Sequence, residues 1–283
     1  MRMLRRAMWA SMFLLAASAG AARAAQSVAP GVELRGTWEQ GAVLYGRAPV
    51  GSKVWLGERE LKLTPGGDFV FGLDRDAPAE AELKVQLPGQ APKTQRYPVA
   101  RREYDIQRIE GLPPKMVTPP PEVLERIKAD QRAVAAARKI DSGGLGFLES
   151  FVWPATGRIS GVFGSQRILN GEPKQPHYGV DVAVPIGTEV RAPAGGVVVL
   201  ANPDMYYTGG TLMIDHGYGL QSAFLHLSKL LVDVGQSVKQ GDVIALSGMT
   251  GRATGPHLDW RTNWYDARVD AQKLVPPMPA AAP

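Results

Sequence analysis

The stretch GPHLDW, residues 255–260, decides how the C-terminal half of the chain is interpreted. In a β-strand, side chains two positions apart point to the same face. His257 and Asp259 would then project together, whereas Leu258 and Trp260 would pack on the opposite side. Such a His–Asp pair belongs either to the surface of an edge strand or to a metal site, so the stretch predicts a strand and leaves its chemistry open.

The same two residue types recur upstream in HYGVD, residues 177–181. Pro176 and Gly179 argue against a helix here, so we expect a loop that enters a strand and turns enough to bring His177 and Asp181 together. A neutral imidazole and a carboxylate are common zinc ligands. A simple hydrogen-bonded pair is nevertheless the commoner meaning of this spacing, and spacing alone does not decide between the two.

Cysteine is absent from the 283 residues, 45% of which are hydrophobic. The length is enough for about two domains. Without thiols, a disulfide framework, a thiol nucleophile and a thiolate zinc site are excluded, so any metal must be held by His, Asp or Glu. All four histidines follow Phe151, at His177, His216, His226 and His257. For His226, which ends a strand predicted at 221–227, a buried core histidine is the alternative to a functional one.

Residues 1–24 have the pattern of an export signal. Arg2, Arg5 and Arg6 precede an apolar run at 7–22, and the stretch ARA at 22–24 fits a cleavage site. No cysteine follows to which a lipid could be attached. We expect an exported, periplasmic protein without stable membrane insertion after cleavage. Secretion or a retained signal anchor are the alternatives.

Charge excludes one class of partner. The whole chain has a formal net charge of +5 and a pI of about 9.4. Cleavage after residue 24 would remove four of the 32 Lys and Arg residues and none of the 27 acids, which leaves 28 against 27. A nearly neutral mature chain does not favour nucleic acid as a partner.

The chain after the signal is predicted to be mainly β. Short apolar runs between Pro and Gly turns predict a small β-sandwich over 30–102, with strands at 31–36, 43–46, 53–56, 60–63, 69–73, 82–87 and 95–99. A Pro-rich linker follows at 103–148, with one helix between 122 and 139. A second β-rich domain is expected at 151–275, with its clearest strands at 158–163, 196–200, 212–215, 221–227, 243–246 and 257–263, and then a Pro/Ala-rich tail at 276–283.

The stretch from 153 to 263 resembles the lysostaphin-type (LytM-like) zinc metallopeptidase domain. The matching motifs occur in order: HxxxD at 177–181, GTxVxAPxxG at 187–196, IDHGYG at 214–219, HLS at 226–228 and GPHxD at 255–259. The resemblance implies a β-rich groove that holds one zinc ion per chain and hydrolyses peptide bonds in the cross-bridges or stems of peptidoglycan. The N-terminal β-domain and the linker also resemble the accessory region of some exported members.

The resemblance assigns roles to five residues. His177 and Asp181 match the first two metal ligands, and His226 and His257 match the catalytic histidines that bind or activate water and stabilise the oxyanion. The family's third ligand is the second His of an HxH motif, and here that position is Asp259. Asp is itself a zinc ligand and reaches about as far as His Nδ1, so we expect it to complete the set. Because two carboxylates neutralise the ion formally, the Lewis acid should be weaker.

Asp259 leaves a second interpretation open: a weak or degenerate peptidase-fold module that docks to other cell-wall hydrolases and regulates them. One of five site positions departs from the family, and it departs to another ligand-type residue, which favours the enzyme. A biotinyl or lipoyl carrier domain is a third interpretation. It matches half-motifs at 190–198 and 234–244 but lacks the lysine displayed between them. His216 matches a family position outside the metal ligands, and we expect it to be structural or groove-lining.

Overall fold

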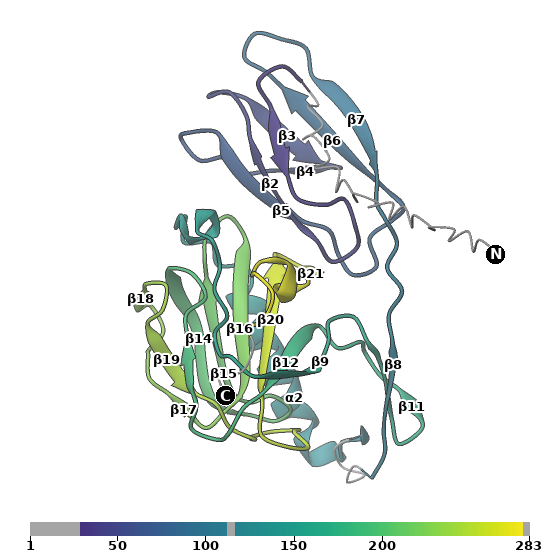
Figure 1. Ribbon diagram of the computed structural model, residues 1–283, viewed down its shortest axis with the longest axis vertical. Helices are drawn as coiled ribbons and strands as arrows, with labels where there is room; N and C mark the ends of the chain where they lie inside the picture. The colour runs from purple at the N-terminus through teal and green to yellow at the C-terminus, as the bar shows by residue number, and fades with distance from the viewer. Residues whose placement is uncertain (1–28, 112–116, 280–283) are drawn as a thin grey trace, which may run out of the picture.

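The computed structural model describes residues 29–111 and 117–279, and it is mainly β, as the sequence predicts (Figure 1). The export signal expected at 1–24 lies outside the described residues. Within the described residues, no helix is both long and apolar enough to cross a membrane.

The N-terminal part forms two antiparallel sheets at one end of the molecule (Figure 1). The first sheet has the order β1-β2-β5, with β1 at Glu33–Arg35, β2 at Val43–Arg47 and β5 at Asp68–Gly72. The second has the order β4-β3-β6-β7, with β3 at Lys53–Leu56, β4 at Arg59–Glu60, β6 at Glu80–Gln86 and β7 at Lys93–Pro98. Each of these strands overlaps one of the seven runs expected from the sequence.

The two sheets bury a shared apolar interior. Leu44 and Phe69 of the first sheet and Leu83 and Tyr97 of the second are fully buried. Trp38 stacks on Tyr97 with 4.1 Å between the ring centroids. Each fully buried side chain of this size contributes about 1.5–3 kcal/mol relative to an exposed one. Trp38 therefore belongs to the packing of the sandwich.

The linker contains a strand that the sequence analysis did not predict. β8 (Ile106–Ile109) pairs in parallel with β10 (Gln166–Leu169), which in turn pairs with β11 (Glu172–Pro173). The helix expected at 122–139 is present as a 3-10 turn, η1 (Pro121–Val123), followed by α2 (Leu124–Ala137). The linker is therefore part strand and part helix.

The C-terminal part is built on one large sheet with the order β18-β14-β15-β16-β20-β12-β9, and β21 pairs with β20. Its strands are β9 (Arg158–Gly161), β12 (Gly179–Ala183), β14 (Gly196–Met205), β15 (Gly209–Asp215), β16 (Leu220–Leu227), β18 (Ser237–Val238), β20 (Leu258–Trp264) and β21 (Ala267–Val269). A second, three-stranded sheet has the order β13-β19-β17, with β13 at Glu189–Arg191, β17 at Lys229–Leu230 and β19 at Val243–Leu246. The C-terminal part also contains two short 3-10 turns, η2 (Gly146–Leu148) and η3 (Ala271–Lys273).

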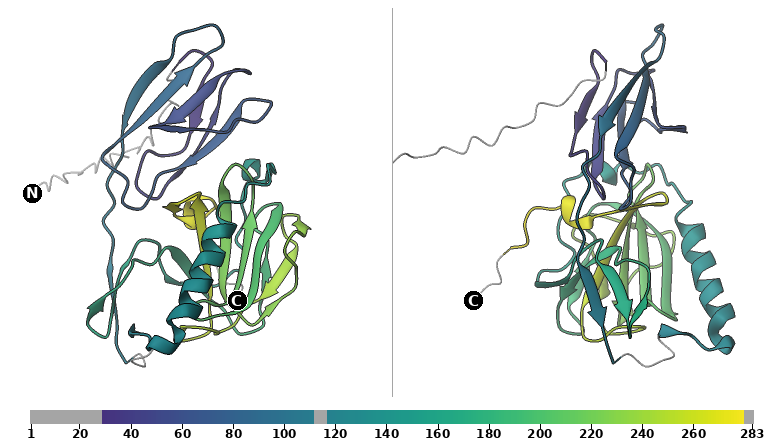
Figure 2. Two further views of the ribbon diagram at one scale, coloured as in Figure 1. Left: turned by 180° about the vertical axis from the view of Figure 1, so that it is seen from behind. Right: turned by 90° about the vertical axis from the view of Figure 1, so that its right-hand side faces the viewer.

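β20 shows the alternation expected from residues 255–260. Leu258 and Trp260 are fully buried on one face. Asp259 lies on the other face, directly opposite Leu225 of β16. Leu225 belongs to the cluster that packs against Ala137 of α2, so α2 covers part of the same face (Figure 2). Because β20 lies between β16 and β12, a pair on an exposed edge strand is excluded.

The sandwich packs directly against the large sheet. β5 contacts β20 and β21, where a Cβ added at Gly72 would lie 2.8 Å from Cβ of Trp264. Arg102, at the start of the linker, forms an ion pair of 2.9 Å with the buried Asp270. These contacts fix the point from which β8 runs toward the predicted site.

Candidate active site

The fold brings the three predicted metal ligands together. His177 lies in the loop before β12, Asp181 lies on β12, and Asp259 is its direct partner on β20. Nε2 of His177 is 3.0 Å from Oδ1 of Asp181 and 3.4 Å from Oδ2 of Asp259. All three residues are buried, and one ligand atom from each lies within 4.8 Å of the others.

Two glycines make room for these carboxylates. A Cβ added at Gly161 would lie 2.2 Å from Oδ2 of Asp181, and one added at Gly179 would lie 2.2 Å from Oδ1 of Asp259. No side chain larger than a hydrogen fits at either position without moving an acid. The strands beside the site are therefore built around the two carboxylates.

The arrangement fits a zinc ion. Nε2 of His177 and Oδ1 of Asp181 are buried, and neither makes a hydrogen bond. In a tetrahedral site with metal–ligand distances of about 2.0–2.1 Å, ligand atoms lie about 3.4 Å apart. The two distances of 3.0 and 3.4 Å from the His177 nitrogen are close to that spacing. Unpaired lone pairs that converge in this way require a shared cation or a proton.

The electrostatics around His177 also favour a positive charge at this site. Burial alone would lower the pKa of His177, but the carboxylates of Asp259 and Asp181 outweigh it and raise that pKa. The site thus stabilises positive charge on or beside the imidazole.

Backbone carbonyls orient all three histidines that the sequence analysis assigned to the site. Nδ1 of His177 donates to the carbonyl oxygen of Val162 at 3.3 Å, Nδ1 of His226 to that of Thr250 at 2.8 Å, and Nδ1 of His257 to that of Gly255 at 2.8 Å. Because a carbonyl can only accept, each Nδ1 carries the proton and each Nε2 is left with a lone pair. A histidine that binds metal commonly has this arrangement.

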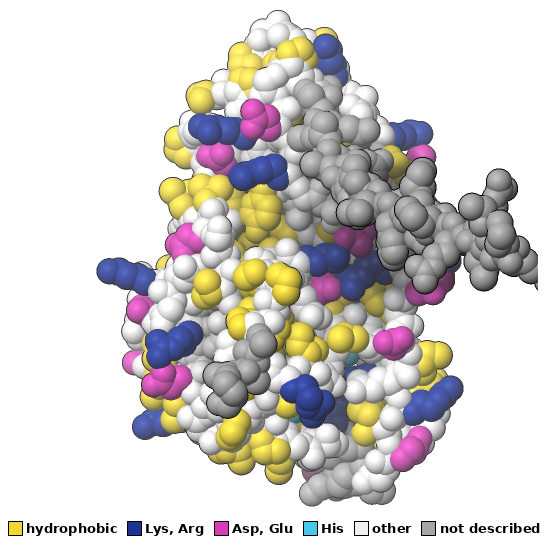
Figure 3. Space-filling view, viewed as in Figure 1, with side chains coloured by type: hydrophobic (Ala, Val, Ile, Leu, Met, Phe, Trp, Pro, Cys, Tyr) yellow, Lys and Arg dark blue, Asp and Glu magenta, His cyan; other side chains and the backbone are white. Residues whose placement is uncertain are grey.

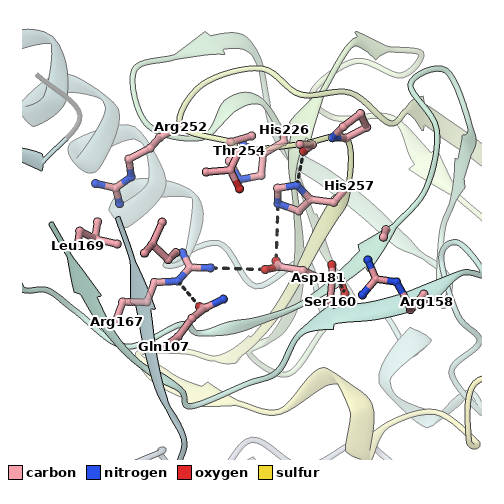
Figure 4. A pocket seen from close by; sticks show the side chains of 15 residues that line it. Gln107, Arg158, Ser160, Arg167, Leu169, Asp181, His226, Arg252, Thr254 and His257 are labelled. Atoms are coloured by element: carbon pink, nitrogen blue, oxygen red, sulfur yellow. Dashed lines mark hydrogen bonds and ion pairs between the residues drawn. The ribbon is translucent and has the colours of Figure 1, made fainter. Parts of the chain in front are cut away.

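The two predicted catalytic histidines lie side by side. Their ring centroids are 4.7 Å apart, and Nε2 of His257 is 3.8 Å from Oδ1 of Asp181 (Figure 4). His226 has a φ of +64°, which non-glycine residues rarely adopt and which is often found at functional sites. Burial lowers the pKa of His226 to about 4, so its imidazole is neutral at pH 7.

His216 has a different environment. Its Nδ1 is 2.8 Å from the carbonyl oxygen of Gly195 and its Nε2 is 2.9 Å from the hydroxyl of Ser222. The side chain is fully buried, and both ring nitrogens are engaged. His216 therefore has no lone pair to offer a ligand, which agrees with the structural role expected for it.

Two arginines that the sequence analysis missed contact the carboxylates of the site. Arg261 donates from Nη2 to Oδ2 of Asp259 at 2.6 Å, and its Nε lies 3.0 and 3.1 Å from the two carboxylate oxygens. Burial would raise the pKa of Asp259, yet the Arg261 guanidinium and His177 hold it well below its usual range. Arg167 approaches Oδ2 of Asp181 at 3.5 Å. Arg261 could have been found from sequence, because it lies two residues after Asp259 on one strand and so shares its face.

Arg261 changes the charge argument for Asp259. An aspartate paired with a guanidinium carries about the same net charge as the neutral histidine that the family has at this position. The second carboxylate therefore weakens the Lewis acidity of a bound ion less than the sequence alone suggests.

Asp259→His is expected to destabilise the protein rather than simply restore the family's ligand. It would leave Arg261, whose side chain is 24% exposed, without its partner beside the site. We expect the free energy of unfolding to fall by about 3 kcal/mol, near the lower end for breaking a buried pair. Urea unfolding of the wild type, Asp259→His and Asp259→His/Arg261→Gln measures this. The double variant should regain most of the loss, and a single variant as stable as the wild type would contradict the coupling.

The site opens into a cavity of about 280 Å³. The cavity is lined by residues of β8, β9, β10 and β12, by His226 and by the loop 252–257. On the face shown in Figure 3, small patches of histidine are visible beside Lys or Arg side chains. Gln107 and Ile109 of the unpredicted strand β8 form part of the wall, so the linker contributes to the cleft.

Comparison with known proteins points to the same part of the chain. The model for "Peptidase family M23" matches residues 175–271, which include all five predicted site residues. A solved Pseudomonas aeruginosa structure assigned to peptidase M23 is 30% identical, with a TM-score of 0.65, and the match covers 84% of this chain and 95% of that one. The likeness thus extends over the sandwich and linker as well as the site.

Two curated relatives match less than half of this chain. The peptidoglycan DD-endopeptidase ShyA of Vibrio cholerae is 44% identical over 108 residues, which is 38% of this chain and 25% of ShyA. The DD-carboxypeptidase/endopeptidase Mpg of Neisseria meningitidis is 39% identical over 119 residues, which is 42% of this chain and 26% of Mpg. The chain spans about a quarter of the length of these relatives.

Proposed function

The chain belongs to peptidase family M23, and from this premise we propose that it is an exported, zinc-dependent endopeptidase that hydrolyses peptide bonds of peptidoglycan. Its relatives ShyA and Mpg are named for DD-endopeptidase activity, which points to bonds between D-configured residues. Export rests on the pattern of residues 1–24, and a periplasmic location is part of the same proposal.

The cluster of His177, Asp181 and Asp259, with His257 and His226 beside it, carries the proposal. His177, Asp181 and Asp259 would hold the ion. When bound, zinc supplies Lewis acidity toward a peptide carbonyl and toward water. Asp259 stays ionised for this role because Arg261 keeps its pKa low.

The two remaining histidines supply proton transfer. His226 is neutral at pH 7 and its Nδ1–H is held by Thr250, so its Nε2 can accept a proton from the attacking water. His257 lies between His226 and Asp181, where its Nε2, once it has taken up a proton, would donate to the oxyanion and then to the leaving amine.

A regulatory module with a degenerate site is the second candidate, favoured only by Asp259. Partner cell-wall enzymes would then replace peptidoglycan as the ligand. Against it stand the carbonyl contacts that orient His177, His226 and His257 and the glycines that accommodate the carboxylates. A module that had lost catalysis would have no need of the strained His226.

Digestion of purified peptidoglycan tests the function. We expect the zinc-loaded protein to release soluble fragments that carry new amino groups from peptide cleavage, and a chelator to stop the release. Mass analysis of the fragments identifies the bond. New reducing sugar ends, or no fragments from a protein that binds zinc, would contradict the proposed endopeptidase.

A further inference from the structure

His177, the first predicted metal ligand, is held by the short segment 162–165 that follows β9. The backbone N–H of His177 donates to the carbonyl oxygen of Ser165 at 2.8 Å, and its carbonyl oxygen accepts from the N–H of Gly164 at 2.7 Å. Nδ1 of the ring lies 3.3 Å from the carbonyl oxygen of Val162. The segment therefore positions both the backbone and the imidazole of this ligand.

An arginine of the N-terminal sandwich holds that segment in turn. Arg75, in the turn between β5 and β6, donates to the carbonyl oxygen of Gly164 from Nε at 2.9 Å and from Nη2 at 2.7 Å. The Arg75 side chain is 11% exposed. Hydrogen bonds from a charged donor are about twice as strong as neutral ones, and two donors on one oxygen fix its direction as well as its distance.

Tyr104, at the start of the linker, packs on the same contact. Its hydroxyl donates to the carbonyl oxygen of Arg75 at 3.2 Å, and the Arg75 guanidinium lies 4.3 Å from its ring centroid. A Cβ added at Gly164, whose φ is +88°, would lie 2.1 Å from the Tyr104 ring. The aromatic ring thus occupies the place of a side chain at Gly164, and Arg75 is fixed over the ring.

Phe163 attaches the segment to the N-terminal part by apolar packing. Its side chain is buried, and its ring meets that of Tyr104 edge-on with 6.3 Å between the centroids. The Arg102 guanidinium lies 5.7 Å from the Phe163 centroid, and a Cβ added at Gly41 would lie 2.8 Å from the Phe163 ring. The segment that orients the metal ligand is therefore packed between the two parts of the chain.

We propose that Arg75 is a positioning residue for the metal site. By fixing the carbonyl of Gly164 it holds the segment 162–165, and through that segment it keeps Nε2 of His177 directed at Asp181 and Asp259. The inference rests on the proposed zinc peptidase. It gives the sandwich a role in the metal site in addition to its packing against the large sheet.

The expected effect of Arg75→Met follows from how far Arg75 lies from the ligand. Loss of a partner that contacts a metal ligand directly costs about 10- to 100-fold in affinity. Arg75 acts through one further residue, so Arg75→Met, which removes the donors and keeps a long apolar side chain, should weaken zinc binding by about 10-fold. Arg75→Lys keeps the charge without the fork and should come within about 3-fold of the wild type.

Two measurements on the full chain test the proposal. Competition with a chelator of known affinity gives Kd for zinc. Hydrogen exchange of the metal-free protein gives the protection of the Gly164 and His177 amides, whose hydrogen bonds join the segment to the ligand. Arg75→Met should speed exchange at these two amides by about 10-fold, because the segment opens locally more often once its charged contact is lost.

Lys273→Met is the matched control. Lys273 forms an ion pair of 2.8 Å with Glu39 of the N-terminal part, so this variant also removes a cation between the two parts of the chain. It removes no hydrogen bond to the segment 162–165, and Kd and both exchange rates should stay within about 2-fold of the wild type. Equal loss of zinc affinity in Lys273→Met and Arg75→Met, with Tm lowered alike, would overturn the specific role of Arg75.

The outcomes separate this inference from the function on which it rests. Zinc-dependent release of peptidoglycan fragments by Arg75→Met, with Kd for zinc unchanged, would support the peptidase and refute the positioning role. A wild type that binds no zinc would refute the zinc peptidase, and faster exchange at Gly164 and His177 in its Arg75→Met variant would still support Arg75 as the residue that positions His177. Faster exchange with an unchanged Kd would overturn the proposal.

Discussion

His177→Ala is expected to lower zinc affinity by at least about 100-fold, because it removes one of three protein ligands, whereas losing a supporting partner alone costs about 10- to 100-fold. It also leaves Asp181 and Asp259 facing each other without the imidazole between them. Metal content after gentle purification and the shift of Tm on adding zinc measure the effect. The wild type should hold about one zinc per chain.

His257→Ala is the matched control for this experiment. His257 lies 3.8 Å from Asp181 yet is not among the predicted ligands, so its removal should leave the zinc content near one per chain. Full zinc occupancy in His177→Ala would mean that the ion sits elsewhere. Loss of zinc in His257→Ala would make His257 a ligand and reassign the site.

Local patterns were enough to predict most strands. Runs such as Lys53–Leu56 and Val243–Leu246 combine β-branched or apolar residues with flanking turn residues, and both have the predicted bounds. The helix after the prolines was also predictable from its composition. These features depend on the nearest neighbours in sequence, which a single chain reveals.

Long-range pairing was not predictable in the same way. β8 is four residues long, and its parallel partner β10 lies about sixty residues further along the chain. The residues next to Ile106–Ile109 therefore do not indicate a strand. The consequence is functional, because β8 brings Gln107 into the cleft beside Arg167. Tertiary context decides strand formation in such segments.

The residues of the site likewise fall into those that the sequence predicts and those that it does not. The motifs at 177–181 and 255–259 identified the residues that the fold brings together, because strand alternation and family resemblance both point to them. Arg167 and Arg252 had no such signal, since they reach the site only through the folding of β10 and the loop 252–257. Nor does the sequence reveal that His226 has a positive φ, which follows from how β16 ends against Thr250.

Loss of either predicted catalytic histidine should stop hydrolysis while the zinc remains. We expect His226→Asn and His257→Ala each to lower kcat by about 100-fold or more, the usual cost of removing a general acid–base group or an oxyanion contact. Asn is chosen at position 226 because it adopts a positive φ more readily than Ala, so backbone strain does not obscure the result.

The two variants together distinguish shared from separate roles. If His226 and His257 act in one proton-transfer unit, as their ring separation of 4.7 Å implies, the double variant should be little slower than either single one. Multiplying losses would instead indicate independent contributions. Release of peptidoglycan fragments, zinc content and Tm are measured on the same preparations, so that a folding defect is recognised. Full activity in both single variants, with zinc bound and Tm unchanged, would refute the assignment of these histidines and with it the proposed mechanism.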